Sequence, residues 1–209
     1  MTPSLKKLHA IIKNKNVLVL GSAPNCKIPK EYSDQWGLIC INASGYIAYK
    51  MKLADPDITI MTISAVLNKD ESNLEAQKNL KGLKTNSIII RYVKNNLIKI
   101  MYRIFFVKKF FQINNFTYNS FYKFPPKIWK PVIKEILRED TEIANNISTG
   151  VFAILLAYYL GATRVYCSGI DPNQNGHAYS KKNLKRSHKL QDQKILNYLS
   201  SRKDLTVLL

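Results

Sequence analysis

Three apolar segments of the chain end in small or polar residues, which is where ligands bind in open parallel sheets. The runs at these ends are Gly21-Ser22-Ala23-Pro24, Asn42-Ala43-Ser44 and Ser168-Gly169-Ile170-Asp171. A fourth run, Ser148-Thr149-Gly150, opens an apolar stretch of helical length, and free N–H groups at a helix start favour anions. The glycines let backbone N–H groups approach a phosphate closely. Each run alone is better explained by turn and capping chemistry, but together the four predict a nucleotide or phosphate site.

Two well-known phosphate-binding loops are absent from the sequence. The segment at Gly21 does not match the G-x-G-x-x-G pattern of dinucleotide-binding proteins, and no G-x-x-x-x-G-K-[ST] sequence of a Walker-type ATPase occurs. Asp55 and Asp57 form the Asp-x-Asp pattern with which many nucleotide-sugar transferases hold a divalent metal. They precede a strand, at the wrong end of the sheet for a ligand. A turn is the better interpretation, and no metal site is predicted.

The chain contains three histidines, and two of them follow the Asp171 segment. His177 and His188 suit general-base catalysis on a sugar hydroxyl because an imidazole titrates near neutral pH. Either one alone is more often a surface side chain, and His9 is expected on the surface of the first helix. Ser187 precedes His188 without a G-x-S-x-G motif, so a hydrolase triad is not supported.

Short apolar strands that alternate with helical segments must position these residues. Strands are expected at 17–20, 38–41, 58–63, 87–92, 164–168 and 205–209, and helices at 5–12, 74–83, 96–106, 148–160 and 190–199. The alternation indicates an α/β fold with a mainly parallel sheet flanked by helices. We find neither an internal repeat nor a linker, so 1–209 is expected to be a single domain.

The amino-acid composition excludes several classes of protein. The 209 residues include 46% hydrophobic ones, which excludes global disorder, and no apolar run reaches the roughly 18 residues of a membrane-spanning helix. The N-terminal stretch lacks the long apolar run of a secretory signal. Three cysteines, Cys26, Cys40 and Cys167, have no metal-ligand spacing and indicate reduced thiols in a cytosolic protein.

The net charge of +18 favours a polyanionic partner: nucleic acid, an anionic membrane surface or a phosphorylated substrate. The charge is concentrated in the middle of the chain. Between Glu75 and Glu135 there are 13 Lys or Arg and no acidic residue, and seven of the eight phenylalanines lie between Phe105 and Phe124. Residues 107–129 show no clean period, and Pro125-Pro126 breaks any helix there. We therefore expect a basic, aromatic-rich insertion or lid at about 95–134.

Several of these motifs, in this order, resemble the bacterial sialyltransferases of glycosyltransferase family 42. The resemblance spans most of the chain and is densest from Asn146 to Lys194. It rests on the runs Asn146-Ile147-Ser148-Thr149-Gly150-Val151, Val165-Tyr166-Cys167-Ser168-Gly169-Ile170-Asp171 and Gln174-Asn175-Gly176, on Gly161 and Tyr179, on His188 before Asp192-Gln193-Lys194, and on Gly21-Ser22-Ala23-Pro24 and Cys40-Ile41-Asn42.

The resemblance implies a Rossmann-like nucleotide-sugar-binding domain, a GT-A-like variant with a small lid, and a metal-independent inverting transferase. The donor would be a CMP-activated sugar such as CMP-sialic acid, with no cofactor. His188 would be the general base and Tyr179 would hydrogen-bond the leaving phosphate. The donor-binding residues it implies are Gly21, Ser22, Asn42, Ser148, Thr149, Gly150, Ser168, Gly169, Ile170, Asp171 and Asn173. Two positions depart from the family pattern, since Asn173 stands where the family has a tyrosine and Asn146 where it has an arginine.

Several alternatives stay open. Some of the motifs are also compatible with a related phosphotransferase that depends on ATP and Mg²⁺, or with an inactive copy of the fold. A nucleic-acid binder is a further alternative, although nucleic acid is not an expected partner. The expected partners are a glycan or glycolipid acceptor, such as lipooligosaccharide or capsule, and an anionic membrane surface. The expected location is the cytoplasm, peripherally associated with the inner membrane. A homo-oligomer is left open.

Overall fold

In the computed structural model a seven-stranded sheet forms the centre of the protein. The described part of the chain leaves out residues 93–96, 138–146, 179–187, 202, 204 and 209. The strand order is β5-β4-β3-β2-β1-β6-β7, and every pairing is parallel. The strands are β1 Asn16–Leu20, β2 Gly37–Ile41, β3 Ile58–Thr62, β4 Lys84–Arg91, β5 Thr117–Phe124, β6 Arg164–Ser168 and β7 Leu205–Leu208. The expected α/β fold with a parallel sheet is confirmed.

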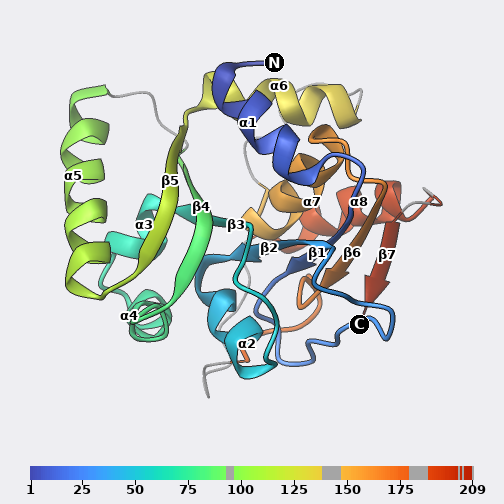
Figure 1. The fold of residues 1–209 in the computed structure, drawn as a ribbon, viewed down its shortest axis with the longest axis horizontal. Helices are drawn as coiled ribbons and strands as arrows, with labels where there is room; N and C mark the ends of the chain where they lie inside the picture. The colour runs from blue at the N-terminus through green and yellow to red at the C-terminus, as the bar shows by residue number, and fades with distance from the viewer. Residues whose placement is uncertain (93–96, 138–146, 179–187, 202, 204, 209) are drawn as a thin grey trace.

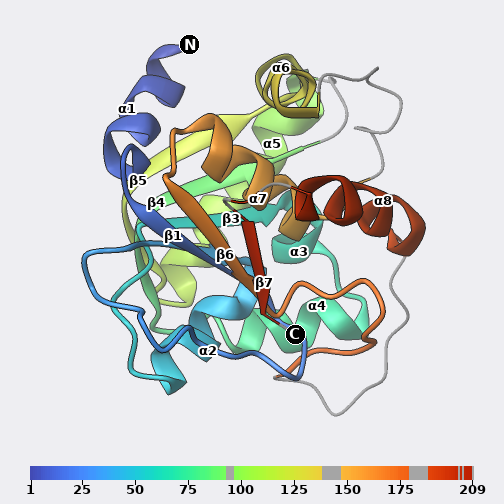
Figure 2. The ribbon, with the colours of Figure 1, turned by 90° about the vertical axis from the view of Figure 1, so that its right-hand side faces the viewer.

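Helices cover both faces of the sheet (Figures 1 and 2). They are α1 Pro3–Ile12, α2 Gly45–Lys50, α3 Ile63–Leu67, α4 Glu71–Lys78, α5 Leu97–Ile113, α6 Pro126–Leu137, α7 Thr149–Tyr159 and α8 Lys189–Ser200, with a 3-10 turn, η1, at Asn42–Ser44. Val17 and Val19 of β1 pack with α1, α6, α7 and α8, whereas Leu18 and Leu20 face α2. The central strands are thus buried on both faces, and for this reason their sequences are short continuous apolar runs.

The α7 helix is the most buried element next to the sheet. Ser148 is its N-cap, and the Ser148 hydroxyl accepts a hydrogen bond from Val151 N at 3.2 Å. The helix ends before Gly161, whose φ of +80° is the left-handed conformation that closes helices. The expected helix from Ser148-Thr149-Gly150 is therefore confirmed, with its start held at a defined place on the sheet.

The segment expected as an insertion or lid folds differently. Its residues 117–124 form β5, which pairs with β4 through Ile89 and Tyr122 and so extends the main sheet at its edge. Pro126 does not break a helix but is the first residue of α6, a position where its missing N–H costs nothing. The β5 strand escaped prediction because its aromatic and polar residues do not alternate. The α5 helix lies beside β5 at the edge of the molecule (Figure 1).

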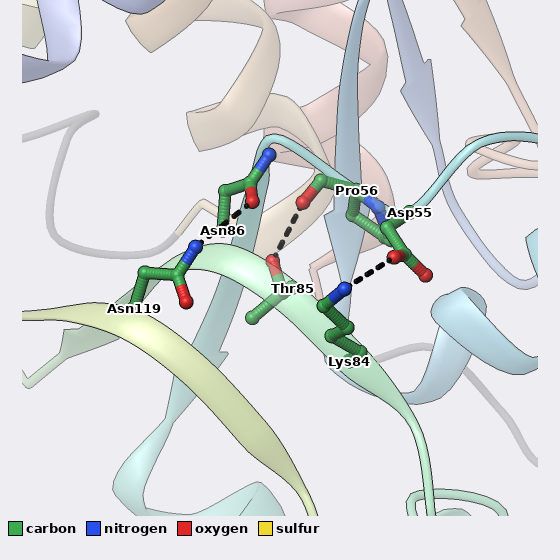
Figure 3. Close-up of polar contacts among 6 residues, drawn as sticks. All are labelled: Asp55, Pro56, Lys84, Thr85, Asn86 and Asn119. Carbon is green, nitrogen blue, oxygen red and sulfur yellow. Dashed lines mark hydrogen bonds and ion pairs between the residues drawn. The ribbon is translucent and has the colours of Figure 1, made fainter.

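Asp55 and Asp57 directly precede β3, at the end of the sheet where the strands begin, and Figure 3 shows Asp55 beside Lys84. Asp57 Oδ2 accepts a hydrogen bond from Leu38 N at 2.9 Å, and the backbone oxygen of Pro56 accepts one from Thr85 Oγ1 at 3.0 Å. Asp55 forms an exposed ion pair with Lys84 at 3.2 Å. The pair therefore joins the starts of β2, β3 and β4.

Within the described ranges, no helix combines the length and the apolar composition that crossing a bilayer requires.

Candidate active site

The strand order changes direction between β1 and β6, because the chain leaves β1 for β2 on one side and later returns to β6 on the other. Side chains and loops diverge at such a switch point and leave a crevice beyond the carboxyl ends of the strands. A cavity of about 490 Å³ opens there. Its lining comes from the ends of β1, β2, β3 and β6 and from the starts of several helices: Gly21, Ser22, Ile41, Asn42, Thr62, Ser64, Ser72, Asn73, Ser148, Thr149, Gly150, Gly169, Ile170, Gly176, His177, His188 and Asp192.

Two glycines form the floor of this cavity. The N–H of Gly21 donates to Ser168 O at 2.8 Å, and Gly169 adopts a φ of +67°. A Cβ on Gly21 would overlap the carbonyl oxygen of Gly169, and one on Gly169 would overlap Cys26 Sγ and lie 2.9 Å from Gly21 C. These glycines are thus required by the contact between the β1 and β6 loops, whatever they do for a ligand.

Asn42 has the features of a binding residue. Its φ of +50° places it in the left-handed region, and its Oδ1 is buried without a hydrogen-bond partner among the described residues. The conformation is held by Ser44, whose hydroxyl accepts from Ile41 N at 2.7 Å and donates to Leu20 O at 2.6 Å. An unpaired buried oxygen costs about 1–3 kcal/mol, so a ligand that donates a hydrogen bond to it would recover that energy.

Helix starts supply the polar wall of the cavity. Thr149 and Gly150 open α7, Ser72 and Asn73 lie in the first turn of α4, and His188 is the N-cap residue of α8. The first N–H groups of a helix lack intrahelical acceptors and carry partial positive charge. This wall can therefore stabilise an anion with backbone amides and hydroxyls.

Two histidines line the cavity. His177 Nδ1 lies 2.7 Å from Ser22 Oγ, and the neighbouring Ala178 N donates to Ser22 O at 2.7 Å. These two contacts hold the loop after β6 against the loop after β1. His188 is partly exposed and its carbonyl oxygen accepts from Asp192 N at 2.9 Å, in the first turn of α8. Either imidazole could accept a proton from a hydroxyl in the cavity.

A buried charge network supports the start of α7. Arg91, at the end of β4, is 3% exposed and donates from Nη1 to Ile147 O at 3.3 Å and to Ser148 O at 3.4 Å. Asp192 Oδ1 accepts from Ser148 N at 2.9 Å. Burial lowers the pKa of Arg91 to about 10, and the nearby carboxylate of Asp192 acts in the opposite direction. Both charges thus fix the backbone of Ser148.

The Arg91 guanidinium also lies over two rings, with its central carbon 4.7 Å from the Trp129 ring centre and 4.8 Å from that of Phe152. Sequence reasoning missed this residue. The available signal was an arginine that directly follows the buried run 88–90 of a strand, where a cation needs partners.

Most of the residues expected at the site are brought together. Those that line the cavity are Gly21, Ser22, Asn42, Ser148, Thr149, Gly150, Gly169, Ile170 and His188. Three others do not line it. Ser168 is fully buried and its hydroxyl accepts from Lys27 N at 2.8 Å, Asp171 accepts from Asn173 N at 2.8 Å, and Asn173 donates to Gln193 at 3.1 Å. Tyr179, expected at the leaving phosphate, lies outside the described residues, as does Asn146.

The structure adds cavity residues that the sequence did not indicate. Thr62 and Ser64 come from the end of β3 and the start of α3, where their hydroxyl oxygens lie 2.9 Å apart. The same rule that singled out the ends of three other strands, applied to β3, would have found them. Ser72 and Asn73 gave no such signal, because α4 has the polar sequence of an ordinary surface helix.

No protein-family model and no curated protein matches the chain. Solved structures do. The sialyltransferase CstII from Campylobacter jejuni, in complex with cytidine-5'-monophosphate, is 19% identical with a TM-score of 0.56, over 94% of this chain and 80% of that one. The monofunctional alpha-2,3-sialyltransferase Cst-I from Campylobacter jejuni is 18% identical with a TM-score of 0.56, over 93% and 76% of the two chains. CST-II in complex with a trisaccharide acceptor and CMP is 18% identical with a TM-score of 0.53, over 93% and 81%. At these identities the likeness establishes a shared fold.

Proposed function

We propose that this chain is a glycosyltransferase that transfers sialic acid from a CMP-activated donor to a glycan acceptor. The observation that carries the proposal is the polar cavity at the switch point between β1 and β6. Solved structures with the same fold include sialyltransferases in complex with CMP. The acceptors we expect are cell-surface glycans such as lipooligosaccharide or capsule.

The cavity suits a nucleoside monophosphate. The backbone N–H groups of Thr149 and Gly150 and the hydroxyls of Ser148 and Thr149, at the start of α7, favour a single phosphate group. The unpaired Oδ1 of Asn42 is an acceptor for an amino or hydroxyl group of cytidine. Because these donors act without a cation, we propose that transfer does not depend on a metal.

The proposed reaction is a single displacement with inversion. The acceptor hydroxyl forms a bond to the anomeric carbon while the bond from that carbon to the CMP phosphate breaks, and the electron pair leaves with the phosphate. Positive charge develops on the sugar ring, as in glycoside chemistry generally. His188 removes the hydroxyl proton, and the helix starts around Ser148 stabilise the departing phosphate.

A thermal-shift screen of CMP, CDP, UDP, GDP and ATP, each with Mg²⁺ and with EDTA, tests the donor class. CMP and CDP should raise the melting temperature by about 5–10 °C at 100 times their dissociation constants, and the shift should persist in EDTA. A shift produced only by ATP with Mg²⁺ would instead support a phosphotransferase. No shift with any of the five would overturn the proposal.

The role of His188 has its own test. His188→Ala should lower transfer at least about 100-fold and leave the CMP-induced shift intact, since the imidazole acts on the acceptor. His9→Ala, on α1 and away from the cavity, is the matched control and should have full activity. If His188→Ala is as active as the wild type while His177→Ala is not, the base is His177, which lies against Ser22.

A further inference from the structure

We propose that the outer face of α5 docks onto an anionic lipid bilayer. We call this surface the α5 face. It lies on the helix beside the edge strand β5 (Figure 1), and none of its residues lines the switch-point cavity. Its defining residues are Met101, Tyr102, Phe105, Lys108, Lys109 and Ile113. The inference goes beyond the proposed sugar transfer and does not rest on it.

Two opposite faces of α5 have different roles. Ile104, Val107 and Phe111 are buried against the sheet. The opposite side is unusually apolar for a surface. Met101 is 71% exposed, Tyr102 67%, Phe105 62% and Ile113 68%. Apolar side chains gathered on one exposed face of this kind mark a binding surface rather than ordinary scatter.

Cations lie among these exposed apolar side chains. Lys108 and Lys109 are exposed on α5, and Lys108 Nζ lies 5.1 Å from the ring centre of Phe121 on β5. Neither α5 nor β5 contains an acidic residue, and none occurs anywhere between Glu75 and Glu135. Aromatic and aliphatic side chains that enter the headgroup boundary, flanked by lysines that reach lipid phosphates, are the features of an interfacial helix.

Charge and packing favour a bilayer over the other occupants. A second copy of a chain with net charge +18 would bring the same lysines face to face and repel. Base stacking needs open ring faces, but here Tyr102 and Phe106 pack edge to face at 4.7 Å and Phe105 and Phe106 at 5.5 Å. The aliphatic residues Met101 and Ile113 would have no role in stacking.

The test is sedimentation with vesicles of phosphatidylcholine alone and with added phosphatidylglycerol, at low and at physiological salt. The wild type should bind only the anionic vesicles. Phe105→Ser should weaken partitioning by about 10- to 100-fold, because the bound protein loses a phenylalanine that the bilayer would bury. Lys108→Glu/Lys109→Glu should weaken it by at least about 25-fold, from about fivefold for each lysine removed. Circular dichroism melting of each variant confirms that these surface changes leave the fold intact.

Matched controls separate this face from net charge and general hydrophobicity. Tyr49→Ser removes an exposed aromatic on α2, and Lys6→Glu/Lys7→Glu reverses an exposed lysine pair on α1. Both should bind anionic vesicles as the wild type does. Equal losses in the α5 variants and the controls would overturn the proposal. So would wild-type binding to neutral vesicles alone, to oligonucleotides but not vesicles, or a dimer that Phe105→Ser dissociates without any vesicle binding. The CMP-induced thermal shift tests the cavity separately, since these variants leave it unchanged.

Discussion

Replacing Arg91 by methionine should destabilise the protein and loosen its cavity together. The change removes the charge-assisted hydrogen bonds to the carbonyl oxygens of Ile147 and Ser148, about 3 kcal/mol at their lengths of 3.3 to 3.5 Å. It also removes the cation–π contacts with Trp129 and Phe152, about 2 kcal/mol.

Part of that loss is returned, because the guanidinium no longer has to be buried. Burial, partly offset by the attraction to Asp192, lowers the pKa of Arg91 to about 10, and this net shift corresponds to roughly 3 kcal/mol. The net expected loss is therefore about 2 kcal/mol, which for a chain of this size lowers the melting temperature by about 4–8 °C. The dissociation constant for CMP should rise by about tenfold, since the start of α7 loses its support.

Urea unfolding followed by circular dichroism measures the stability, and calorimetric titration measures CMP binding. Arg103→Met, an exposed arginine on α5, is the control and should change stability by less than about 0.5 kcal/mol. Asp192→Asn should cost only about 1 kcal/mol, because the amide oxygen can still accept from Ser148 N. Equal stability of the Arg91 and Arg103 variants, or unchanged CMP affinity in the former, would refute the reasoning.

Two further expectations concern stability. Gly21→Ala should lower the free energy of unfolding, measured in urea, by about 3 kcal/mol, because the new Cβ meets the carbonyl oxygen of Gly169. The control Gly45→Ala, whose Cβ would make ordinary contacts at 3.6 Å, should cost nothing. Equal effects of the two changes would contradict the close contact at Gly21. Burial raises the pKa of Cys40 and of Cys167 to about 12 from 9.0. Unfolded thiols lose their protons first, so stability should fall as pH rises above about 9, by about 1 kcal/mol per thiol between pH 9 and 10. A double Cys→Ala variant that declined as steeply from pH 8 to 10 would be at odds with this assignment.

The strands that the sequence predicts well are those that helices cover on both faces of the sheet. β1, β2 and β6 are short apolar runs because helices cover both faces, and the predicted ranges differ from the observed strands by one residue at most. β5 has only one neighbour and is partly exposed along its length, so its side chains follow no period. Its place in the sheet comes from pairing with β4, which is a tertiary contact.

The residues of the candidate site likewise fall into those that the sequence predicts and those that it does not. Residues that directly follow strands, such as Ser22 and Asn42, are predictable because chain order alone places them at the carboxyl edge. Ser168 was expected there too, but it is still inside the strand and its hydroxyl serves Lys27. Arg91 and Asp192 act through partners more than 40 residues away, and no local pattern encodes such a pairing.

The glycine floor limits how this site can be redesigned. A side chain at Gly21 or Gly169 would force the neighbouring loops after β1 and β6 to shift, so neither position can be varied. Changes in ligand preference must therefore come from its walls, at positions such as Thr62, Ser72 and Asn73. A library confined to those helix starts would sample new donors while keeping the strand junction intact.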